Sequence, residues 1–256
     1  MTQRTRQSAP LERPVVIVKV GATEPTVRAA QRGDFEHWFS RGMELGPDEW
    51  SVVAPFEGDA LPSPDRCAGI VVTGSSAMIT DRADWSERTK DWLAGAVDAG
   101  RPVLAICYGH HLLADAFGGR SDWNPNGREI GTVQVELEDA AADDPLLHGL
   151  GSPLIVQESH SQAVLELPPT AKRLAHNAHD PCQGFRLGAH AWSFQFHPEF
   201  TADIVRGYIT ARREAIESEG LDVEALFAAL ADDPAGQTIL ARFGAYVRER
   251  AATQEA

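Results

Sequence analysis

Residues 103–113 read VLAICYGHHLL and contain a short apolar run that ends at Cys107. The apolar run predicts a strand that is buried on both faces of a parallel sheet. A helical pattern begins directly after the cysteine and ends at the glycine pair 118–119. A reactive side chain on such a sharp strand-to-helix turn is typical of a nucleophile elbow. The segment therefore predicts a reactive thiol at the carboxyl end of a central strand.

The residues around Cys107 suit this turn. Ala105 and Gly109, two positions before and after the cysteine, are small enough for the strand and the helix to approach closely. The following helix directs its N-terminal amides at the sulfur, which lowers the pKa of the thiol. The amide of Tyr108 is then placed to donate to an oxyanion. A cysteine after a buried strand is also common in protein cores, so other segments must decide between the two interpretations.

Further apolar runs precede this segment, at residues 15–20, 51–54 and 69–73. Helical patterns separate them, at residues 27–39 and 85–99. Strands that alternate with helices favour an α/β fold. We expect a mostly parallel, doubly wound sheet with helices on both faces.

The second half of the chain has a different pattern. Residues 131–137 read GTVQVEL, an alternation that is typical of a half-exposed strand. This change indicates antiparallel strands that extend the parallel core, and we expect them at residues 154–157, 172–175 and 192–196. The chain then becomes helical and predicts an extra helical C-terminal tail that packs on the domain. Its expected helices are residues 203–217, residues 221–230 and a last one with the apolar stripe Ile239, Leu240, Phe243, Tyr246 and Val247.

Residues 192–200 read WSFQFHPEF and place a histidine at the end of an apolar strand. Pro198 favours an extended backbone at His197, so the side chains of His197 and Glu199 point to the same side. A carboxylate beside an imidazole fixes its tautomer and stabilises its charged form. The pair can serve as the base and the orienting group of a Cys–His–Glu triad. The alternative is an incidental ion pair at a strand end.

Residues 71–76, VVTGSS, end another strand in a turn of small residues. Such a turn can expose the backbone amides of Gly74 and Ser75 beside a neighbouring active site, although an ordinary strand-to-helix turn has the same composition. The turn precedes Cys107 by about thirty residues, and the His197 segment follows much later.

In this order the segments resemble the class I (triad-type) glutamine amidotransferase family, as in the amidotransferase half of GMP synthetase. Residues 157–160, QESH, are similar to the family's Ser-His segment. The resemblance implies a flavodoxin-like fold and one amidotransferase domain at residues 14–202. We expect a disordered tail at residues 1–13 and a helical extension at 203–256 that packs on the same domain. This layout is similar to that of stand-alone members.

The resemblance implies a role for each site residue. Cys107 would attack the γ-carboxamide of glutamine, His197 would transfer protons, and Glu199 would orient His197. The amides of Tyr108 and of Gly74 or Ser75 would hold the oxyanion. Water would then release glutamate from a γ-glutamyl thioester.

Substrate contacts are also implied by the resemblance. Ser159 and His160 would contact the substrate glutamine. His111 stands where the family usually carries a glutamine that helps to hold the α-amino and α-carboxylate groups. Ala105 stands where the family usually has glycine, a milder change. A histidine at 111 leaves the triad unchanged, but it replaces a residue that contributes to the family's preference for free glutamine.

Composition limits partners and cofactors. The formal net charge of −14 argues against nucleic acid and an anionic membrane surface. Cys67, Cys107 and Cys182 are too few for a disulfide framework, and no signal peptide or membrane span is apparent, so we expect reduced thiols in the cytoplasm. We expect no metal, because His176 and His179 lack a matching cluster. We also expect no cofactor, because the sequence lacks phosphate-loop and dinucleotide fingerprints.

Three functions remain open from the sequence. The first is a glutamine amidotransferase or glutaminase, with any ammonia accepted by a separate synthetase chain. The second is a γ-glutamyl hydrolase that acts on another γ-glutamyl amide, which the histidine at 111 favours. The third is a non-catalytic regulatory protein on the same fold, although a complete triad has no physical purpose there.

Overall fold

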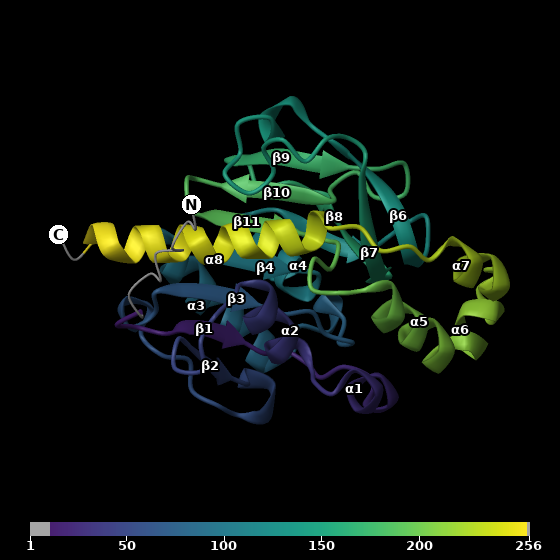
Figure 1. Ribbon diagram of the computed structural model, residues 1–256, viewed down its shortest axis with the longest axis horizontal. Coiled ribbons are helices and arrows are strands. Elements are labelled where there is room, and N and C mark those ends of the chain that lie inside the picture. Colours follow the sequence, from purple (N-terminus) through teal and green to yellow (C-terminus); the bar gives the residue numbers. More distant parts are fainter. Residues whose placement is uncertain (1–10, 255–256) are drawn as a thin grey trace, which may run out of the picture.

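The computed structural model of the protein describes residues 11–254. Nine strands form one central sheet, and two others form a separate antiparallel pair (Figure 1). The strands are β1 (Val15–Val18), β2 (Trp50–Val53), β3 (Gly69–Val72), β4 (Val103–Ile106), β5 (Arg120–Trp123), β6 (Glu129–Leu137), β7 (Leu154–His160), β8 (Gln162–Glu166), β9 (Ala171–His176), β10 (Gly184–Leu187) and β11 (Ala191–Phe194). The helices are α1 (Pro25–Gln31), α2 (Phe35–Gly42), α3 (Asp84–Asp98), α4 (Tyr108–Ala116), α5 (Ala202–Ala211), α6 (Arg213–Ser218), α7 (Val223–Ala229) and α8 (Ala235–Gln254).

The part of the sheet that carries Cys107 is parallel. Strands β2, β1, β3, β4 and β11 lie side by side in that order, each parallel to its neighbours. All four residues of β1, β3, β4 and β11 are buried, as their apolar sequences predict. The expected α/β fold with a mostly parallel central sheet is therefore confirmed. Parallel strands end at one edge of the sheet, where open α/β sheets bind their ligands.

Beyond β11 the sheet continues with antiparallel strands, in the order β10, β9, β6 and β7. The pairing of β6 with β7 places Glu129 opposite His160 and Gly131 opposite Glu158. The backbone amide of His197 donates to the carbonyl of Gln157 in β7 over 2.9 Å. The antiparallel extension thus reaches back to the edge where the parallel strands end.

Helices cover both faces of the parallel sheet, because alternate strand residues point to opposite sides. Val15, Ile17 and Leu104 belong to one apolar cluster, which also contains residues of α2, α5 and α8. Val16 and Val103 belong to a second cluster, with residues of α3 and α4. In Figure 1, α8 crosses the near face of the sheet, and α3 and α4 lie behind it.

The helix expected at residues 27–39 is wrong in one respect, because the structure divides it into α1 and α2. Arg32 adopts a left-handed conformation with φ of 50° and ends α1. The Asp34 side chain then accepts from the amide of Phe35 and caps α2. The same carboxylate accepts from Lys19 and from the amide of Thr23, which ties the break to the end of β1. A buried capping carboxylate therefore overrides the helical periodicity.

The helix expected at residues 203–217 is also interrupted. α5 ends at Arg212, whose φ of −111° and ψ of 13° lie outside the helical range, and α6 begins at the next residue. Arg212 thereby leaves the helical path. Residues 120–123 form β5 and pair with β8, and a turn follows at residues 124–128.

The two ends of the chain pack differently. We expect a disordered tail at residues 1–13, and residues 1–10 of this tail lie outside the described residues. The amide of Leu11 donates to the carboxylate of Glu49. At the other end, Ile204 of α5 and Phe243 of α8 are buried in the same cluster as β1 and β4. The boundary at residue 202 stays a prediction. Within residues 11–254, none of the helices is both long enough and apolar enough to cross a membrane.

Candidate active site

Cys107 occupies the strained turn between β4 and α4. Its φ of 52° and ψ of −101° are unusual for a residue with a side chain, and only 5% of its surface is exposed. Two residues later, a Cβ added to Gly109 would lie 2.7 Å from the carbonyl oxygen of Val72. The close approach of β3 to α4 therefore requires glycine at 109, as the sequence predicts, whereas the methyl group of Ala105 fits within the buried strand.

Groups that can hold an oxyanion lie beside the thiol. Tyr108 is the first residue of α4, so its N–H has no acceptor within the helix. The Tyr108 hydroxyl lies 2.7 Å from Ser86 Oγ, which fixes the start of α4. A Cβ on Gly74 would lie 2.8 Å from His197 Cε1 and 3.5 Å from Cys107 Cβ. The turn at Gly74 and Ser75 thus packs directly against both reactive residues.

The three expected triad residues meet in space. His197 Nδ1 lies 2.7 Å from Glu199 Oε1, and the Cys107 thiol is close enough to His197 to hydrogen-bond. The exposed fractions of the His197 and Glu199 side chains are 3% and 0%. The His197 ring also stacks on Phe200, with ring centroids 3.9 Å apart and planes 9° apart. The imidazole therefore has one fixed orientation.

The charges of Cys107 and His197 support a thiolate. Burial raises the pKa of the Cys107 thiol, but the charge of His197 and its hydrogen bond bring that pKa below the ordinary value. Burial lowers the pKa of His197, but Glu199 and Cys107 outweigh it and raise the pKa to about 10. Each partner favours the charged form of the other, which supports a thiolate beside an imidazolium.

A cavity of about 280 Å³ leads to Cys107. Another cavity of about 530 Å³ lies between α2, α5 and α8 and touches Glu199 but not Cys107. A substrate must reach the sulfur, so we assign the smaller cavity as the active site. Its walls come from six segments of the chain and consist of Glu24, Ser75, Ser76, Ala77, Met78, Cys107, Tyr108, His111, Arg128, Ser159, His160, Ser161, Gln162 and Arg212.

The substrate-contact residues expected from the resemblance all lie in this cavity wall. His111 is 4% exposed, and its Nε2 lies 2.8 Å from Gln195 Oε1. Burial lowers the pKa of His111 to about 4, so the ring is neutral at physiological pH. Ser159 Oγ accepts from Arg212 Nη1 over 3.3 Å. The roles of these residues toward a substrate remain predictions.

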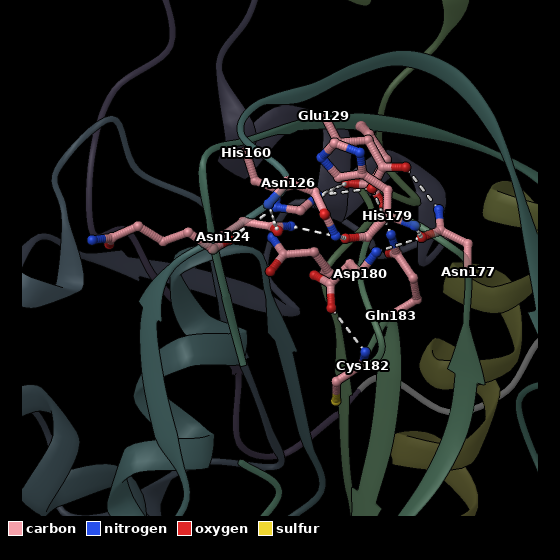
Figure 2. A network of polar contacts seen from close by, with 12 residues as sticks. Asn124, Asn126, Glu129, His160, Asn177, His179, Asp180, Cys182 and Gln183 are labelled. Atoms are coloured by element: carbon pink, nitrogen blue, oxygen red, sulfur yellow. Dashed lines mark hydrogen bonds and ion pairs between the residues drawn. The ribbon is translucent and has the colours of Figure 1, made fainter. Parts of the chain in front are cut away.

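His160 belongs to a buried polar network behind the cavity (Figure 2). Its Nδ1 faces the carbonyl oxygen of Gln162 at 2.9 Å, and its Nε2 faces Glu129 Oε2 at 3.0 Å. Glu129 also accepts from Asn177 and Gln183 over 2.7 and 2.8 Å, as a carboxylate does. Both ring nitrogens of His160 must therefore donate, which makes the ring an imidazolium. Burial opposes this charge, but Glu129 and Asp180 raise the pKa of His160.

Glu158 lies next to this network and is fully buried. Its Oε2 is 3.6 Å from His160 Nε2. Burial and the carboxylates of Glu129 and Asp180 raise the pKa of Glu158 well above its ordinary value, which favours its neutral form. Glu129, Glu158 and His160 are close enough to surround a metal ion. However, both nitrogens of His160 already carry protons, so the charges are explained without one.

Several cavity residues give no signal in the sequence. Arg212 and Glu24 are 188 positions apart, yet Arg212 Nε donates to Glu24 Oε1 over 3.0 Å. Arg128 is held by Glu219 of the C-terminal extension over 2.7 and 2.8 Å. Glu129, the partner of His160, is the first residue of β6. Only the pairing of distant segments reveals these residues, since none has a motif or a spacing of its own.

Comparison with known proteins identifies the family of this site. The family model of class-I glutamine amidotransferase matches residues 53–211, which include the elbow, the triad and the cavity wall from Ser75 to Ser161. The chain belongs to the class I glutamine amidotransferase family. A GMP synthase of Aeropyrum pernix is 36% identical over 173 residues, covering 65% of this chain and 31% of that relative.

Other relatives have different names. γ-Glutamyl peptidase 4 of Arabidopsis thaliana is 27% identical over 162 residues, covering 62% of this chain and 64% of the peptidase. The amidotransferase chain therefore spans less than two thirds of the length of both relatives. A glutamine amidotransferase structure from Thermotoga maritima is similar in fold, with a TM-score of 0.73, 20% identity and coverage of 92% of this chain and 98% of that one.

Proposed function

We propose that this class I amidotransferase chain hydrolyses the γ-carboxamide of glutamine through a thioester on Cys107. The arrangement of Cys107, His197 and Glu199 at the end of a 280 Å³ cavity carries this proposal. A thiolate beside an imidazolium combines a nucleophile with a proton donor for the leaving group.

The reaction begins when Cys107 Sγ bonds to the γ-carbonyl carbon and the oxygen becomes an oxyanion. The N–H groups of Tyr108 and of Gly74 or Ser75 stabilise that charge. His197 then gives its proton to the leaving nitrogen, the C–N bond breaks, and ammonia departs from a γ-glutamyl thioester. His197 next takes a proton from water as the water attacks the thioester. Breakage of the C–S bond releases glutamate and regenerates the thiolate.

The test is release of glutamate by the purified chain from L-glutamine, with Cys107→Ala as the control. We expect release that depends on Cys107. Absence of release, together with rapid alkylation of Cys107, would argue against glutamine as the substrate and for another γ-glutamyl amide. A slowly alkylated Cys107 would contradict the thiolate itself and support the non-catalytic alternative.

A second candidate is hydrolysis of a γ-glutamyl amide other than glutamine. Two observations favour it: His111 is neutral and bonded to Gln195, and the chain is similar to a protein named γ-glutamyl peptidase. The chemistry on Cys107 is the same, and only the leaving amine differs. Glutamate release from γ-glutamyl dipeptides, compared with L-glutamine under the same conditions, separates the two candidates.

The partner and the compartment are part of this proposal. A relative from Ignicoccus hospitalis is named as one subunit of a GMP synthase and is 30% identical over 168 residues, covering 65% of this chain and 84% of that relative. This name supports a separate synthetase chain as the acceptor of ammonia. The three cysteines are unpaired and buried, which supports the cytoplasm as the compartment.

A further inference from the structure

Glu24 and Arg212 form an ion pair in the wall of the catalytic cavity. Arg212 Nε lies 3.0 Å from Glu24 Oε1, and the Arg212 and Glu24 side chains remain 22% and 31% exposed. Solvent screens a partly exposed ion pair and limits its contribution to stability. The position of this pair beside the route to Cys107 therefore points to a ligand rather than to the fold.

Arg212 is held in place from several directions. Its guanidinium lies 4.9 Å from the centre of the Tyr208 ring, and its Nη1 donates to Ser159 Oγ over 3.3 Å. Its backbone interrupts the path from α5 to α6. Arg212 also lines a small second cavity that contains Cys107, His197 and Phe200. The guanidinium is thus fixed near the reacting thiol.

Glu24 contributes the opposite charge from the N-terminal half of the chain. It stands at the N-cap position of α1, but its side chain forms no capping hydrogen bond there. Its carboxylate is directed at Arg212 instead. The cavity wall therefore presents a carboxylate and a guanidinium side by side. This arrangement complements a ligand with an ammonium and a carboxylate on one carbon.

We propose that Glu24 and Arg212 bind the α-amino and α-carboxylate groups of the γ-glutamyl substrate. Arg212, with Ser159, takes the α-carboxylate, and Glu24 takes the α-ammonium. This assignment rests on the proposed function, because it requires a γ-glutamyl group whose amide reaches Cys107. It also defines the substrate class: γ-glutamyl compounds in which both α-groups are free.

Arg128 is the competing cation of the cavity, and its geometry is less suitable. Its Nε and Nη2 both donate to the Glu219 carboxylate, so one edge of the guanidinium is already saturated. It also does not line the small cavity that contains Cys107 and His197. We therefore assign the α-carboxylate to Arg212 rather than to Arg128.

The test measures binding without turnover, in the Cys107→Ala background, by titration calorimetry. The ligands are L-glutamine, glutaramate, which lacks the α-amino group, and 4-aminobutanamide, which lacks the α-carboxylate. We expect L-glutamine to bind at least about tenfold more tightly than either analogue, since a hydrogen-bonded charge is lost in each. Equal binding of all three ligands, or no binding of L-glutamine, would overturn the proposal.

A second substitution in the Cys107→Ala background tests which side chain binds which α-group of the ligand. Arg212→Gln is expected to weaken L-glutamine binding about tenfold or more and to leave 4-aminobutanamide unchanged. Glu24→Gln is expected to weaken L-glutamine binding to a similar extent and to leave glutaramate binding unchanged. Arg213→Gln is the matched control, because Arg213 is adjacent, is paired with Glu217 and Glu224, and does not line the cavity. It should bind all three ligands like the parent.

Two outcomes separate this proposal from the proposed function. If the wild-type chain releases glutamate but Arg212→Gln weakens all three ligands equally, the subsite is overturned while the hydrolase remains. If Arg128→Gln gives the selective loss instead, the α-carboxylate lies at Arg128 and the assignment to Arg212 is wrong.

Discussion

At the scale of single residues, the reactivity of Cys107 depends on groups that surround one sulfur atom. The strained turn exposes the thiol to the start of α4, and His197 supplies the charge that overcomes burial. A buried thiol without that charge would have a raised pKa, as Cys67 has at about 11. The same residue type therefore has a lowered pKa directly after one strand and a raised pKa shortly before another.

The pH dependence of alkylation follows from the pair of pKa shifts. Because the pKa of Cys107 is lowered, the thiolate persists below the pH at which an ordinary thiol protonates, so alkylation should continue there. Turnover should fall as the pH rises through about 10, where His197 loses the proton needed by the leaving group. In His197→Asn, we expect alkylation at pH 7 to slow by at least about tenfold. An unchanged rate would contradict the ion pair.

His111→Gln tests the residue at which the chain departs from its family. A neutral imidazole and an amide can each donate and accept, but Nε2 of the ring is already bonded to Gln195. We expect kcat/KM for L-glutamine to rise, by less than about tenfold, since about one hydrogen bond is gained. Steady-state release of glutamate measures the change. A fall would show that the histidine itself holds the substrate.

At the scale of elements, the pairing of β6 with β7 creates the charged network behind the cavity. Register alone brings Glu129 opposite His160 and places Glu158 in the interior. The pKa of Glu129 is lowered, which favours a carboxylate beside His160, whereas the pKa of Glu158 is raised well above its ordinary value, which favours a neutral acid. The two substitutions to glutamine should therefore differ.

Glu129→Gln removes the counter-charge of a buried His160. We expect it to lower the free energy of unfolding by about 3–5 kcal/mol, because it breaks a buried pair. Glu158→Gln replaces a neutral acid by a neutral amide of the same shape, so we expect a change within about 1 kcal/mol and retained activity. Urea unfolding, followed by circular dichroism, measures both. Equal losses would mean that Glu158 is charged.

At the scale of the whole molecule, α8 packs into the same apolar core as strands β1 and β4. Phe243 is fully buried against Trp192 of β11, with ring centroids 6.2 Å apart. β11 also leads into the His197 segment, so the C-terminal helix supports the strand that precedes His197. The apolar stripe expected from the sequence is therefore a packing surface.

Phe243→Ala should lower the free energy of unfolding by about 3–5 kcal/mol, because it leaves a cavity in the main core. Thr253→Ala, an exposed substitution near the end of the same helix, is the control and should change stability by less than about 0.5 kcal/mol. Chemical unfolding of both variants tests this difference. A small effect of Phe243→Ala would mean that α8 is dispensable for the core.

Local sequence was enough to predict the parallel strands, the elbow at Cys107 and the positions of His197 and Glu199. These features depend on neighbours within a few residues: apolar runs, the small residues around the cysteine, and the extended backbone before Pro198. The single helix expected at residues 27–39 was wrong, because the capping carboxylate of Asp34 also accepts a hydrogen bond from Lys19, the residue after β1.

Which distant charges share the cavity depends on the packing of the whole chain. Glu24 and Arg212 come from opposite ends of the chain, and Glu129 meets His160 through strand register. The charge of His160 depends on two acceptors that no local pattern places beside it. Local sequence fixes backbone conformation, whereas burial and opposing charge fix protonation, and both arise only when separate segments pack together.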